Sequence, residues 1–250
     1  LSGKFGDAGK KIIIEEFLTG FEVSYFVICD VKNFKSLGFA HDYKKVGEND
    51  TGLNTGGMGT YSPSSKVSKD LEERIIKTII EPTIAGLRKE NCEFVGILFA
   101  GLMVNEKSEP KLLEYNIRFG DPETQVILPR LKTDFADLIF SATNQELDKI
   151  NIEFDEEKHV VCVVMASKGY PEAYKKDGKI NLAEAKKVEN TQIFHAGTKL
   201  KDGEILASGG RVLNVIGFGN NVEIARKNAY EAVSKVDWQD GFFRSDIAKV

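Results

Sequence analysis

The stretch LEYNIRFGDPE, residues 113–123, shows the most informative local pattern in the chain. An apolar run, Gly96–Val104, precedes it, and the polar turn between the two predicts an antiparallel hairpin. In the second strand of that hairpin, Glu114 and Asn116 lie two residues apart and therefore point to the same face. A carboxylate and a carboxamide oxygen side by side are hard ligands suited to Mg²⁺, which takes few protein ligands together with phosphate oxygens. Arg118 continues this face and would place a cation where it can clamp phosphate or carboxylate charge.

A glycine-rich segment, Asp50–Gly59, is the second pattern that suggests a binding site. Its glycines allow backbone N–H groups to converge on an anion, because no Cβ blocks the approach. A surface loop without a ligand explains the same composition, and a strand that ends in a surface turn likewise explains the E-x-N-x-R pattern of residues 114–118. Ser208–Arg211 is open in the same way, since it fits a phosphate seat or a turn into a strand. The chain contains neither a P-loop nor a dinucleotide-binding glycine motif.

Two strands are predicted near the start of the chain, at Lys11–Phe17 and at Glu22–Cys29, with a break at Gly20. The free backbone groups of such a strand edge can hydrogen-bond a purine, and a carboxylate such as Glu22 can accept ribose hydroxyls. An exposed acidic strand end is the plainer alternative.

The rest of the chain predicts an α+β fold. Residues 41–66 lack hydrophobic periodicity and predict a long ordered loop, while Asp70 is expected to cap a helix that Pro82 kinks. Asp134 is expected to cap a second helix. We place a domain boundary in the acidic stretch near residues 151–158, which divides the chain into residues 1–152 and 153–250. Beyond it, strands are predicted at Val160–Ala166, Gln192–His195 and Arg211–Phe218, and a helix at Val222–Val236.

Composition excludes several classes of protein. Of the 250 residues, 42% are hydrophobic and 29% are charged, which rules out wholesale disorder. The formal net charge of −4 has the wrong sign for a general nucleic-acid binder, and the longest apolar run is about half of the ~20 residues that a membrane helix needs. Three widely spaced cysteines match no metal-binding pattern; they are expected to be buried and indicate a reducing, cytoplasmic compartment. The histidines are isolated in the sequence and are each expected to be structural: His41, His159 and His195.

Several segments, taken in order, closely resemble the phosphoribosylamine–glycine ligase family of the ATP-grasp superfamily. They are Ile14–Leu18, Asp42 with Lys44, Asn54–Gly59, Glu114–Gln125, Gly169–Pro171, His195–Thr198 and Gly209–Leu213. The resemblance implies an ATP-grasp core, a mostly antiparallel sheet with flanking helices, followed by a small α+β C-terminal domain. It also implies that an N-terminal domain and glycine-rich lid strands precede the stretch that begins here, so the chain corresponds to the C-terminal part of such an enzyme.

Members of the family join glycine to 5-phosphoribosylamine with ATP through glycyl phosphate, in de novo purine biosynthesis. The resemblance implies ATP and Mg²⁺ or Mn²⁺ as cofactors and a monomeric intact enzyme in the cytoplasm. It implies metal binding by Glu114 and Asn116, catalysis by Arg118 and Asp121, nucleotide binding by Glu15, Glu16, Leu18, Glu22, Asp42 and Lys44, and substrate binding by Asn54, Thr55, Gly56, Gly57, Met58, Gly59 and Arg211. Asp42 and Lys44 would also shape the acceptor side. Two alternatives stay open: another ATP-grasp carboxylate–amine ligase, and a non-catalytic nucleotide-binding module.

Overall fold

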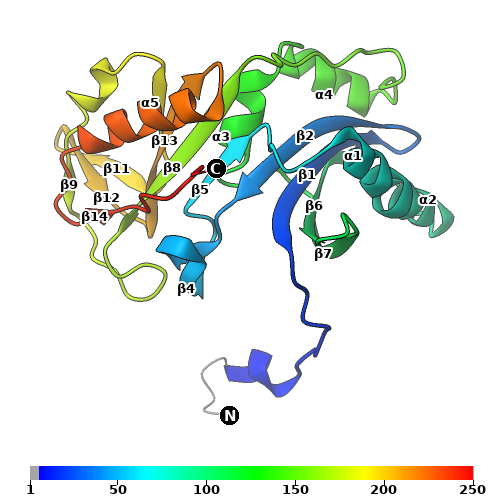
Figure 1. The fold of residues 1–250 in the computed structure, drawn as a ribbon, viewed down its shortest axis with the longest axis horizontal. Helices are drawn as coiled ribbons and strands as arrows, with labels where there is room; N and C mark the ends of the chain where they lie inside the picture. The colour runs from blue at the N-terminus through cyan, green and yellow to red at the C-terminus, as the bar shows by residue number, and fades with distance from the viewer. Residues whose placement is uncertain (1–5, 250) are drawn as a thin grey trace.

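The computed structural model describes residues 6–249 and is organised around one antiparallel sheet of nine strands (Figure 1). The strands follow the order β10-β13-β8-β5-β2-β1-β6-β7, and β14 pairs with β8 outside this path. Their bounds are β1 (Phe21–Asp30), β2 (Phe34–Asp42), β5 (Gly59–Ser62), β6 (Val95–Val104), β7 (Pro110–Asn116), β8 (His159–Ser167), β10 (Thr191–His195), β13 (Arg211–Gly219) and β14 (Gly241–Phe242). The mostly antiparallel α+β fold is therefore confirmed.

Strand β1 is the centre of the first half, and the sequence prediction of a strand there is confirmed. It pairs with β2 on one edge and with β6 on the other, and its side chains alternate between two cores. Tyr25 and Val27 face one apolar cluster, whereas Phe26 and Ile28 face another. Because both faces are covered, the strand needs apolar residues at successive positions instead of strict alternation.

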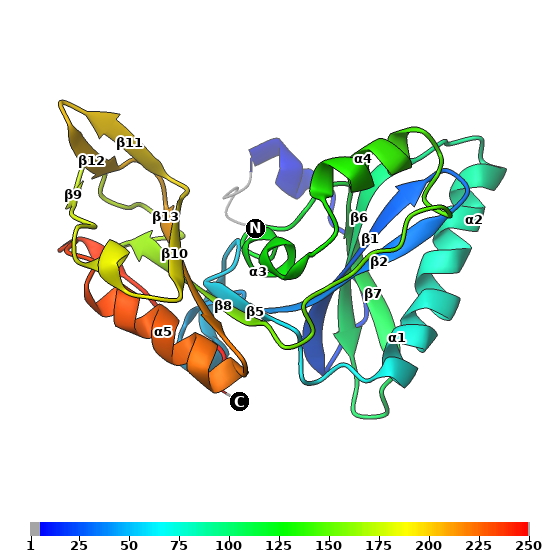
Figure 2. The same cartoon turned by 90° about the horizontal axis from the view of Figure 1, so that it is seen from above.

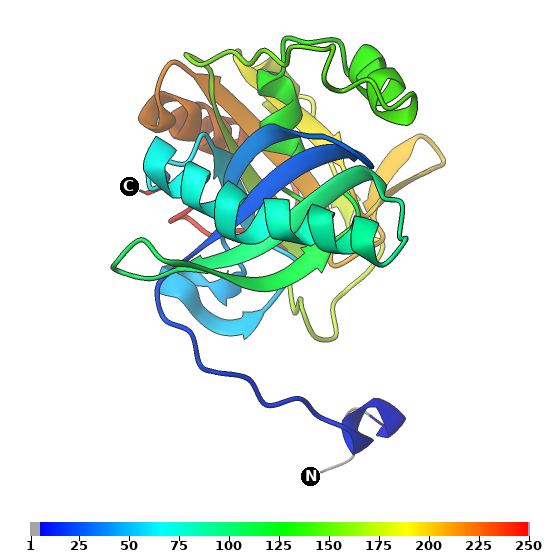
Figure 3. The ribbon, with the colours of Figure 1, turned by 90° about the vertical axis from the view of Figure 1, so that its right-hand side faces the viewer.

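A nearly continuous helical rod covers the first of these clusters (Figure 3). It consists of α1 (Lys69–Ile75), a π-helical turn at Ile76–Ile80 and α2 (Glu81–Lys89). Pro82 lies in the first turn of α2, directly after the π-helical turn. Because proline has no N–H to donate, the hydrogen-bond pattern changes just before it, whereas the kink expected there stays a prediction. The predicted cap at Asp70 is wrong: Ser68 caps the helix, because its hydroxyl accepts a hydrogen bond from the N–H of Leu71 at 3.2 Å.

The second half packs α5 (Val222–Ser234) against β13 and β8. Small residues allow a close approach, since a Cβ at Gly217 would lie 2.1 Å from the carbonyl oxygen of Ala225. On the opposite face lie α3 (Thr124–Ile127) and α4 (Phe135–Thr143), and the predicted cap at Asp134 is confirmed by its bonds to two backbone N–H groups. The remaining elements are β9 (Lys179–Ile180), β11 (Thr198–Lys201) and β12 (Glu204–Ala207), which form a small sheet, and the 3₁₀ turns Gly6–Lys10, Glu48–Asp50, Leu128–Arg130 and Ala185–Lys187.

The main sheet runs without a break from one half of the chain to the other. Residues Gly59–Ser62 of β5 pair with Val160–Val163 of β8, and β5 also pairs with the end of β2. The halves are thus joined by backbone hydrogen bonds as well as by the covalent chain. The division into residues 1–152 and 153–250 stays a prediction.

Two predicted features of the first half are wrong. The strand expected at Lys11–Phe17 is an extended coil that leaves the body of the molecule, with Ile14 88% and Phe17 90% exposed (Figure 1). No strand within residues 6–249 pairs with this segment, so its apolar residues do not become part of a sheet. The loop expected over residues 41–66 instead contains β3 (Lys45–Gly47), β4 (Thr51–Asn54) and β5, which are too short to show a period in the sequence.

The structure also tests the expectations about the cysteines and about membrane-spanning helices. Cys29 and Cys162 are buried as expected, but Cys92 is exposed because it lies in the turn after α2. Across residues 6–249, no helix has the length and apolar character needed to cross a membrane.

Candidate functional site

A small cleft opens where the ends of β1 and β2 meet the hairpin of β6 and β7. Strand pairing explains its position: Ser24 of β1 lies opposite Gly101 of β6, and Gly101 lies opposite Glu114 of β7. Because Gly101 has no side chain, the Glu114 side chain can pack across it, with its Cγ 3.3 Å from where a Cβ would be. The cleft, here called the carboxylate cleft, has a volume of about 290 Å³ and is lined by Glu22, Val23, Ser24, Asp42, Lys44, Asn54, Thr55, Gly101, Leu102, Leu113 and Glu114.

Buried charge marks the floor of this cleft. The side chain of Asp42 is only 3% exposed, and its Oδ2 lies 3.0 Å from Nζ of Lys44. Burial raises the pKa of Asp42, and the Lys44 ammonium offsets that rise only in part. Burial alone would lower the pKa of Lys44, but the Asp42 carboxylate, together with Glu123 and Glu22, outweighs burial and raises the pKa. Lys44 therefore stays charged between acidic neighbours.

Glu123 is a further buried acid beside this pair. It precedes α3, and its Oε1 accepts a 2.9 Å hydrogen bond from the Ser24 hydroxyl. Burial, and then the nearby Asp42 carboxylate, raise the pKa of Glu123 to about 7. Glu123 is therefore close to half-protonated at neutral pH.

The cleft has more acceptors than the surrounding protein satisfies. Oε2 of Glu22 and Oδ1 of Asp42 are both buried, and no donor among residues 6–249 reaches either. Lys44 Nζ lies 4.0 Å from Glu22 Oε2, at the limit of an ion pair. One lysine thus faces three carboxyl groups, and buried acceptors of this kind normally have donors. The arrangement suits a ligand that brings hydroxyl, N–H or cationic groups.

The predicted metal ligands lie together on one face of β7. Asn116 Nδ2 donates to Glu114 Oε1 at 3.2 Å, and Arg118 Nη2 donates to Asn116 Oδ1 at 3.2 Å. One carboxylate and one carboxamide oxygen fit Mg²⁺, which takes few protein ligands and keeps positions for phosphate oxygens. Within the described part of the chain, no group of three or more His, Cys, Asp or Glu side chains could hold a metal ion alone.

The glycine-rich loop Asn54–Gly59 folds against Arg211 and Asp121. The Arg211 guanidinium donates to the carbonyl oxygens of Gly56 and Asp121, and its Nη2 lies 3.3 Å from Asp121 Oδ2. Gly57 has a φ of +109°, and a Cβ there would lie 2.7 Å from Asp42 Oδ1, so this position requires glycine. The loop therefore carries Asn54 and Thr55 to the cleft and links it to Asp121.

The residues predicted for the purine lie apart from this arrangement. Glu15 and Glu16 are exposed, and Glu16 forms a 2.6 Å ion pair with Lys111. Leu18 helps to line a hollow of about 100 Å³ beside β6 and β7, not the carboxylate cleft. The structure therefore brings together the predicted residues Glu22, Asp42, Lys44, Asn54, Thr55 and Glu114, and leaves Glu15, Glu16 and Leu18 outside the cleft.

Sequence reasoning gave no role to Glu123 or to Ser24. Glu123 belongs to the quoted motif, but its residue type does not indicate that the chain folds back and buries the side chain against β1. Ser24 lies in an apolar strand, where a single hydroxyl predicts nothing. Tyr170, whose hydroxyl accepts a 3.0 Å hydrogen bond from the N–H of Gly56, belongs to the segment Gly169–Pro171, to which the family resemblance assigns no role.

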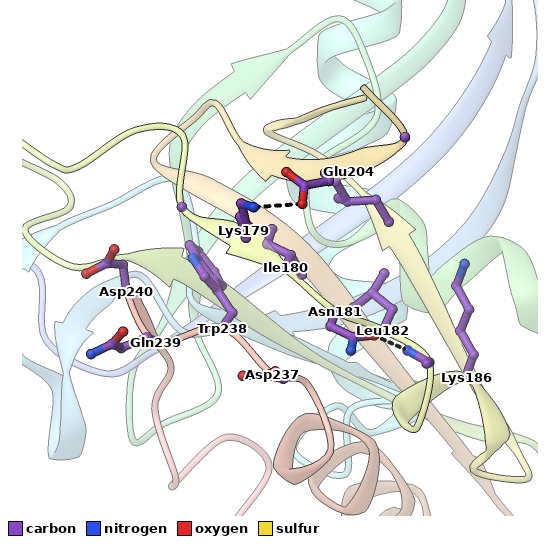
Figure 4. A pocket seen from close by; sticks show the side chains of 14 residues that line it. Lys179, Ile180, Asn181, Leu182, Lys186, Glu204, Asp237, Trp238, Gln239 and Asp240 are labelled. Atoms are coloured by element: carbon purple, nitrogen blue, oxygen red, sulfur yellow. Dashed lines mark hydrogen bonds and ion pairs between the residues drawn. The ribbon is translucent and has the colours of Figure 1, made fainter. Parts of the chain in front are cut away.

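A larger hollow lies in the second half, beside Trp238 (Figure 4). This Trp238 hollow has a volume of about 780 Å³, and the ion pair between Lys179 and Glu204 lies at its side. No residue that the sequence marked for chemistry lines it.

Comparisons with known proteins agree with the geometry. The family model "Phosphoribosylglycinamide synthetase, ATP-grasp (A) domain" matches residues 1–124, and the corresponding "C domain" model matches residues 160–250. Among curated relatives, "Phosphoribosylamine--glycine ligase, chloroplastic" of Arabidopsis thaliana is 47% identical over 99% of this chain and 47% of its own length. The phosphoribosylamine–glycine ligase of Agrobacterium fabrum is 48% identical over 98% of this chain and 57% of its own. That of Vigna unguiculata is 47% identical over 98% of this chain and 80% of its own.

Solved structures give the same result for the fold. The phosphoribosylamine–glycine ligase of Thermotoga maritima superposes with a TM-score of 0.83 at 36% identity, over 93% of this chain and 57% of that one. The biotin carboxylase domain of the Hydrogenobacter thermophilus 2-oxoglutarate carboxylase superposes with a TM-score of 0.61 at 14% identity, over 89% and 46%, which shows a shared fold alone. The chain spans about half the length of the first two curated relatives. Matching family models over both halves and close relatives over nearly its whole length place the chain in the phosphoribosylamine–glycine ligase family, with the ATP-grasp fold.

Proposed function

We propose that this chain serves an enzyme that ligates glycine to 5-phosphoribosylamine with ATP, giving glycinamide ribonucleotide, ADP and phosphate in de novo purine biosynthesis. The observation that carries the proposal is the carboxylate cleft. It joins Glu114 of the paired strand, the buried Asp42–Lys44 pair and the glycine-rich loop in one small space. Its family supports the choice of substrates, because relatives bear the name of this ligase.

Glu114 and Asn116 are proposed to hold Mg²⁺ or Mn²⁺ on the phosphates of ATP. The metal, when bound, neutralises phosphate charge, so that an anionic carboxylate can approach. Asn116 Oδ1 presently accepts from Arg118. A cation on that oxygen would release the guanidinium, and Arg118 would then be available to the transferring phosphoryl group or to the carboxylate of glycine.

The other site residues are proposed to position the substrates. Glu22 would accept the ribose hydroxyls of ATP with its unpartnered Oε2, and Glu15, Glu16 and Leu18 would contact the adenine. Asp42 and Lys44 would serve both the nucleotide and the acceptor. Asp121, Arg211 and the loop of Asn54, Thr55, Gly56, Gly57, Met58 and Gly59 would shape the acceptor side.

The chemistry requires activation of a poor electrophile. A carboxylate does not expel O²⁻, but its phosphorylated form, glycyl phosphate, can release phosphate when the amine attacks. Positioning and charge neutralisation account for most of such catalysis. The attacking amine must also lose a proton. Glu123 lies behind Ser24, which lines the cleft and donates a hydrogen bond to it. With a pKa of about 7, Glu123 is suited to take that proton by way of the Ser24 hydroxyl near neutral pH.

The second candidate is a module that binds nucleotide without catalysis. The predicted purine contacts of residues 14–18 lie on an exposed coil that builds no pocket with the cleft. A cytoplasmic location and a monomer stay predictions from the sequence.

A calorimetric and kinetic experiment on the purified chain separates the two candidates. Mg²⁺–ATP is titrated first, and ADP release is then measured with and without glycine and 5-phosphoribosylamine. Release that depends on both substrates and falls ~10²–10³-fold in Glu114→Gln supports the ligase. Nucleotide binding without any substrate-dependent release supports the binding module and contradicts ligase activity of this chain by itself.

A further inference from the structure

A fourth cavity, here called the Asn214 pocket, lies between the start of α3 and the strands β10 and β13. Its volume is about 930 Å³, and its lining includes Asp121, Gln125, Lys158, His195 and Asn214. In Figure 2, α3 lies near the middle of the molecule, beside the strands of the second half, and α3 contacts both β8 and β13. The pocket thus touches Asp121 but is separate from the carboxylate cleft.

Two amide oxygens in this pocket lack hydrogen bonds. Asn214 stands in the middle of β13 between Phe194 and Val164, is only 2% exposed, and its Oδ1 has no donor in the described part of the protein. Gln125 donates to Asp121 Oδ1 at 3.0 Å, but its own buried Oε1 has no donor either. Buried carboxamides nearly always have partners. The missing partners are therefore donors, such as the hydroxyl groups of a sugar.

The same pocket offers two groups for an anion. Nζ of Lys158 lies 4.8 Å from the centre of the Phe218 ring, and it forms no ion pair with a carboxylate of residues 6–249. The Nδ1 of His195 is paired with the Thr198 hydroxyl at 3.1 Å, which leaves Nε2 for a ligand. An ammonium group and an imidazole beside a cavity suit a phosphate.

Asp121 connects the pocket to the glycine-rich loop. Its Oδ1 accepts from Gln125, whereas its Oδ2 and its backbone carbonyl face Arg211, which also holds Gly56. A ligand that lies in the pocket with one end at Asp121 therefore reaches the edge of the proposed ligation site.

We infer that the Asn214 pocket holds the phosphorylated sugar of the acceptor, with its hydroxyls at Gln125 and Asn214 and its phosphate at Lys158 and His195. The inference rests on the proposed function, which requires a phosphoribosyl acceptor. The cavity, its two amide oxygens without donors and a lysine without a carboxylate partner among residues 6–249 together point to a ligand that combines hydroxyl and phosphate groups.

Ribose 5-phosphate is the probe, because it carries both groups and is chemically stable. It is titrated by calorimetry into the purified chain and into three variants. Lys158→Gln and His195→Ala are expected to raise the Kd about 10-fold or more, since each removes a charged or polar partner of the phosphate. Asn214→Leu is expected to do the same, provided that its circular dichroism spectrum and melting temperature stay near those of the parent. Lys186→Gln, in the Trp238 hollow, is the matched control and should leave the Kd unchanged.

Three results would overturn the inference. They are no binding of ribose 5-phosphate at millimolar concentration, binding that Lys158→Gln and His195→Ala leave unchanged, and tighter binding of adenosine monophosphate that Lys158→Gln weakens. The last would make the pocket a nucleotide site. Loss of glycine-dependent ADP release with intact, Lys158-dependent binding would instead contradict the proposed ligase and leave the pocket assignment standing.

Discussion

The carboxylate cleft and the Trp238 hollow differ in size and in the way they hold charge. The hollow is larger, about 780 Å³ against about 290 Å³, but its ion pair joins Lys179 and Glu204, whose side chains are 73% and 50% exposed (Figure 4). In the cleft, Asp42 is buried against Lys44, and Glu22 and Asp42 retain oxygens without donors. In the hollow, water solvates the charged side chains at little cost in free energy. In the cleft, the charges are shielded from water, so neighbouring protein groups or a ligand must stabilise them. Unsatisfied buried charge, not volume, therefore distinguishes the candidate site.

The largest effect is expected at Arg244, which holds the short hairpin of β3 and β4. This arginine is 1% exposed, grips Asp246 with two hydrogen bonds, and donates to Asp50 and to the carbonyl of Lys45. Its guanidinium also lies over the ring of Tyr43, next to Asp42. We expect Arg244→Ala to lower the free energy of unfolding by about 3–5 kcal/mol, because it removes a buried guanidinium and leaves Asp246 and the carbonyl of Lys45 without their donor.

Urea denaturation measures this change. Arg244→Lys is the matched control, since it keeps the positive charge but loses the pair of hydrogen bonds to Asp246. Its free energy of unfolding should lie between those of the parent and the alanine variant. A loss below about 1 kcal/mol in the alanine variant, as for a surface pair, would contradict a structural role for this buried network.

A rate effect of ~10²–10³-fold is expected at Glu114. Glu114→Ala removes the carboxylate of the proposed metal pair but leaves an exposed strand position, so the fold should be retained. The measurement is substrate-dependent ADP release, together with the Mg²⁺ concentration that gives half-maximal activity. Glu204→Ala removes another exposed acid, in the Trp238 hollow; it is the control and should leave both unchanged. Near-normal turnover of Glu114→Ala at saturating Mg²⁺ would contradict the metal assignment.

Glu123 should make stability depend on pH. Its pKa is about 7 in the folded chain against 4.5 for an ordinary glutamate, so folding favours its protonated form. That contribution is fully present below pH 4.5 and is lost as the pH rises to 7, by about 3 kcal/mol in total. Glu123→Gln cannot titrate, and its free energy of unfolding relative to the parent should therefore increase between pH 4.5 and pH 7.

The comparison between the two proteins isolates this effect. His41 also titrates, because burial lowers its pKa to about 4, but it is present in both and cancels. Parallel stability curves for the parent and for Glu123→Gln across this pH range would show that Glu123 does not carry a raised pKa.

The sequence predicted the parts of the site that depend on strand geometry. Glu114 and Asn116 share a face because side chains alternate along any strand, and the hairpin that holds them follows from apolar runs and a polar turn. The buried position of Glu123 could not be predicted, because it depends on contacts with β1 about a hundred residues away. The strand prediction for Lys11–Phe17 is wrong for a related reason. Its residue types suit a strand, but a strand forms only where a neighbouring strand can pair with it.

The smallest effect is expected at the ion pair of the Trp238 hollow. It tests whether exposed charge in the hollow contributes less to stability than buried charge in the carboxylate cleft. Lys179 Nζ lies 2.7 Å from Glu204 Oε1, a good contact by distance alone. Because both side chains are well exposed, water and salt screen the attraction, and a double-mutant cycle of Lys179→Met and Glu204→Gln should give a coupling energy of only about 0–1 kcal/mol. Raising the salt concentration should reduce it further. A coupling of about 3 kcal/mol that salt leaves unchanged would mean that the hollow holds charge as the cleft does, and burial would then no longer separate the two regions.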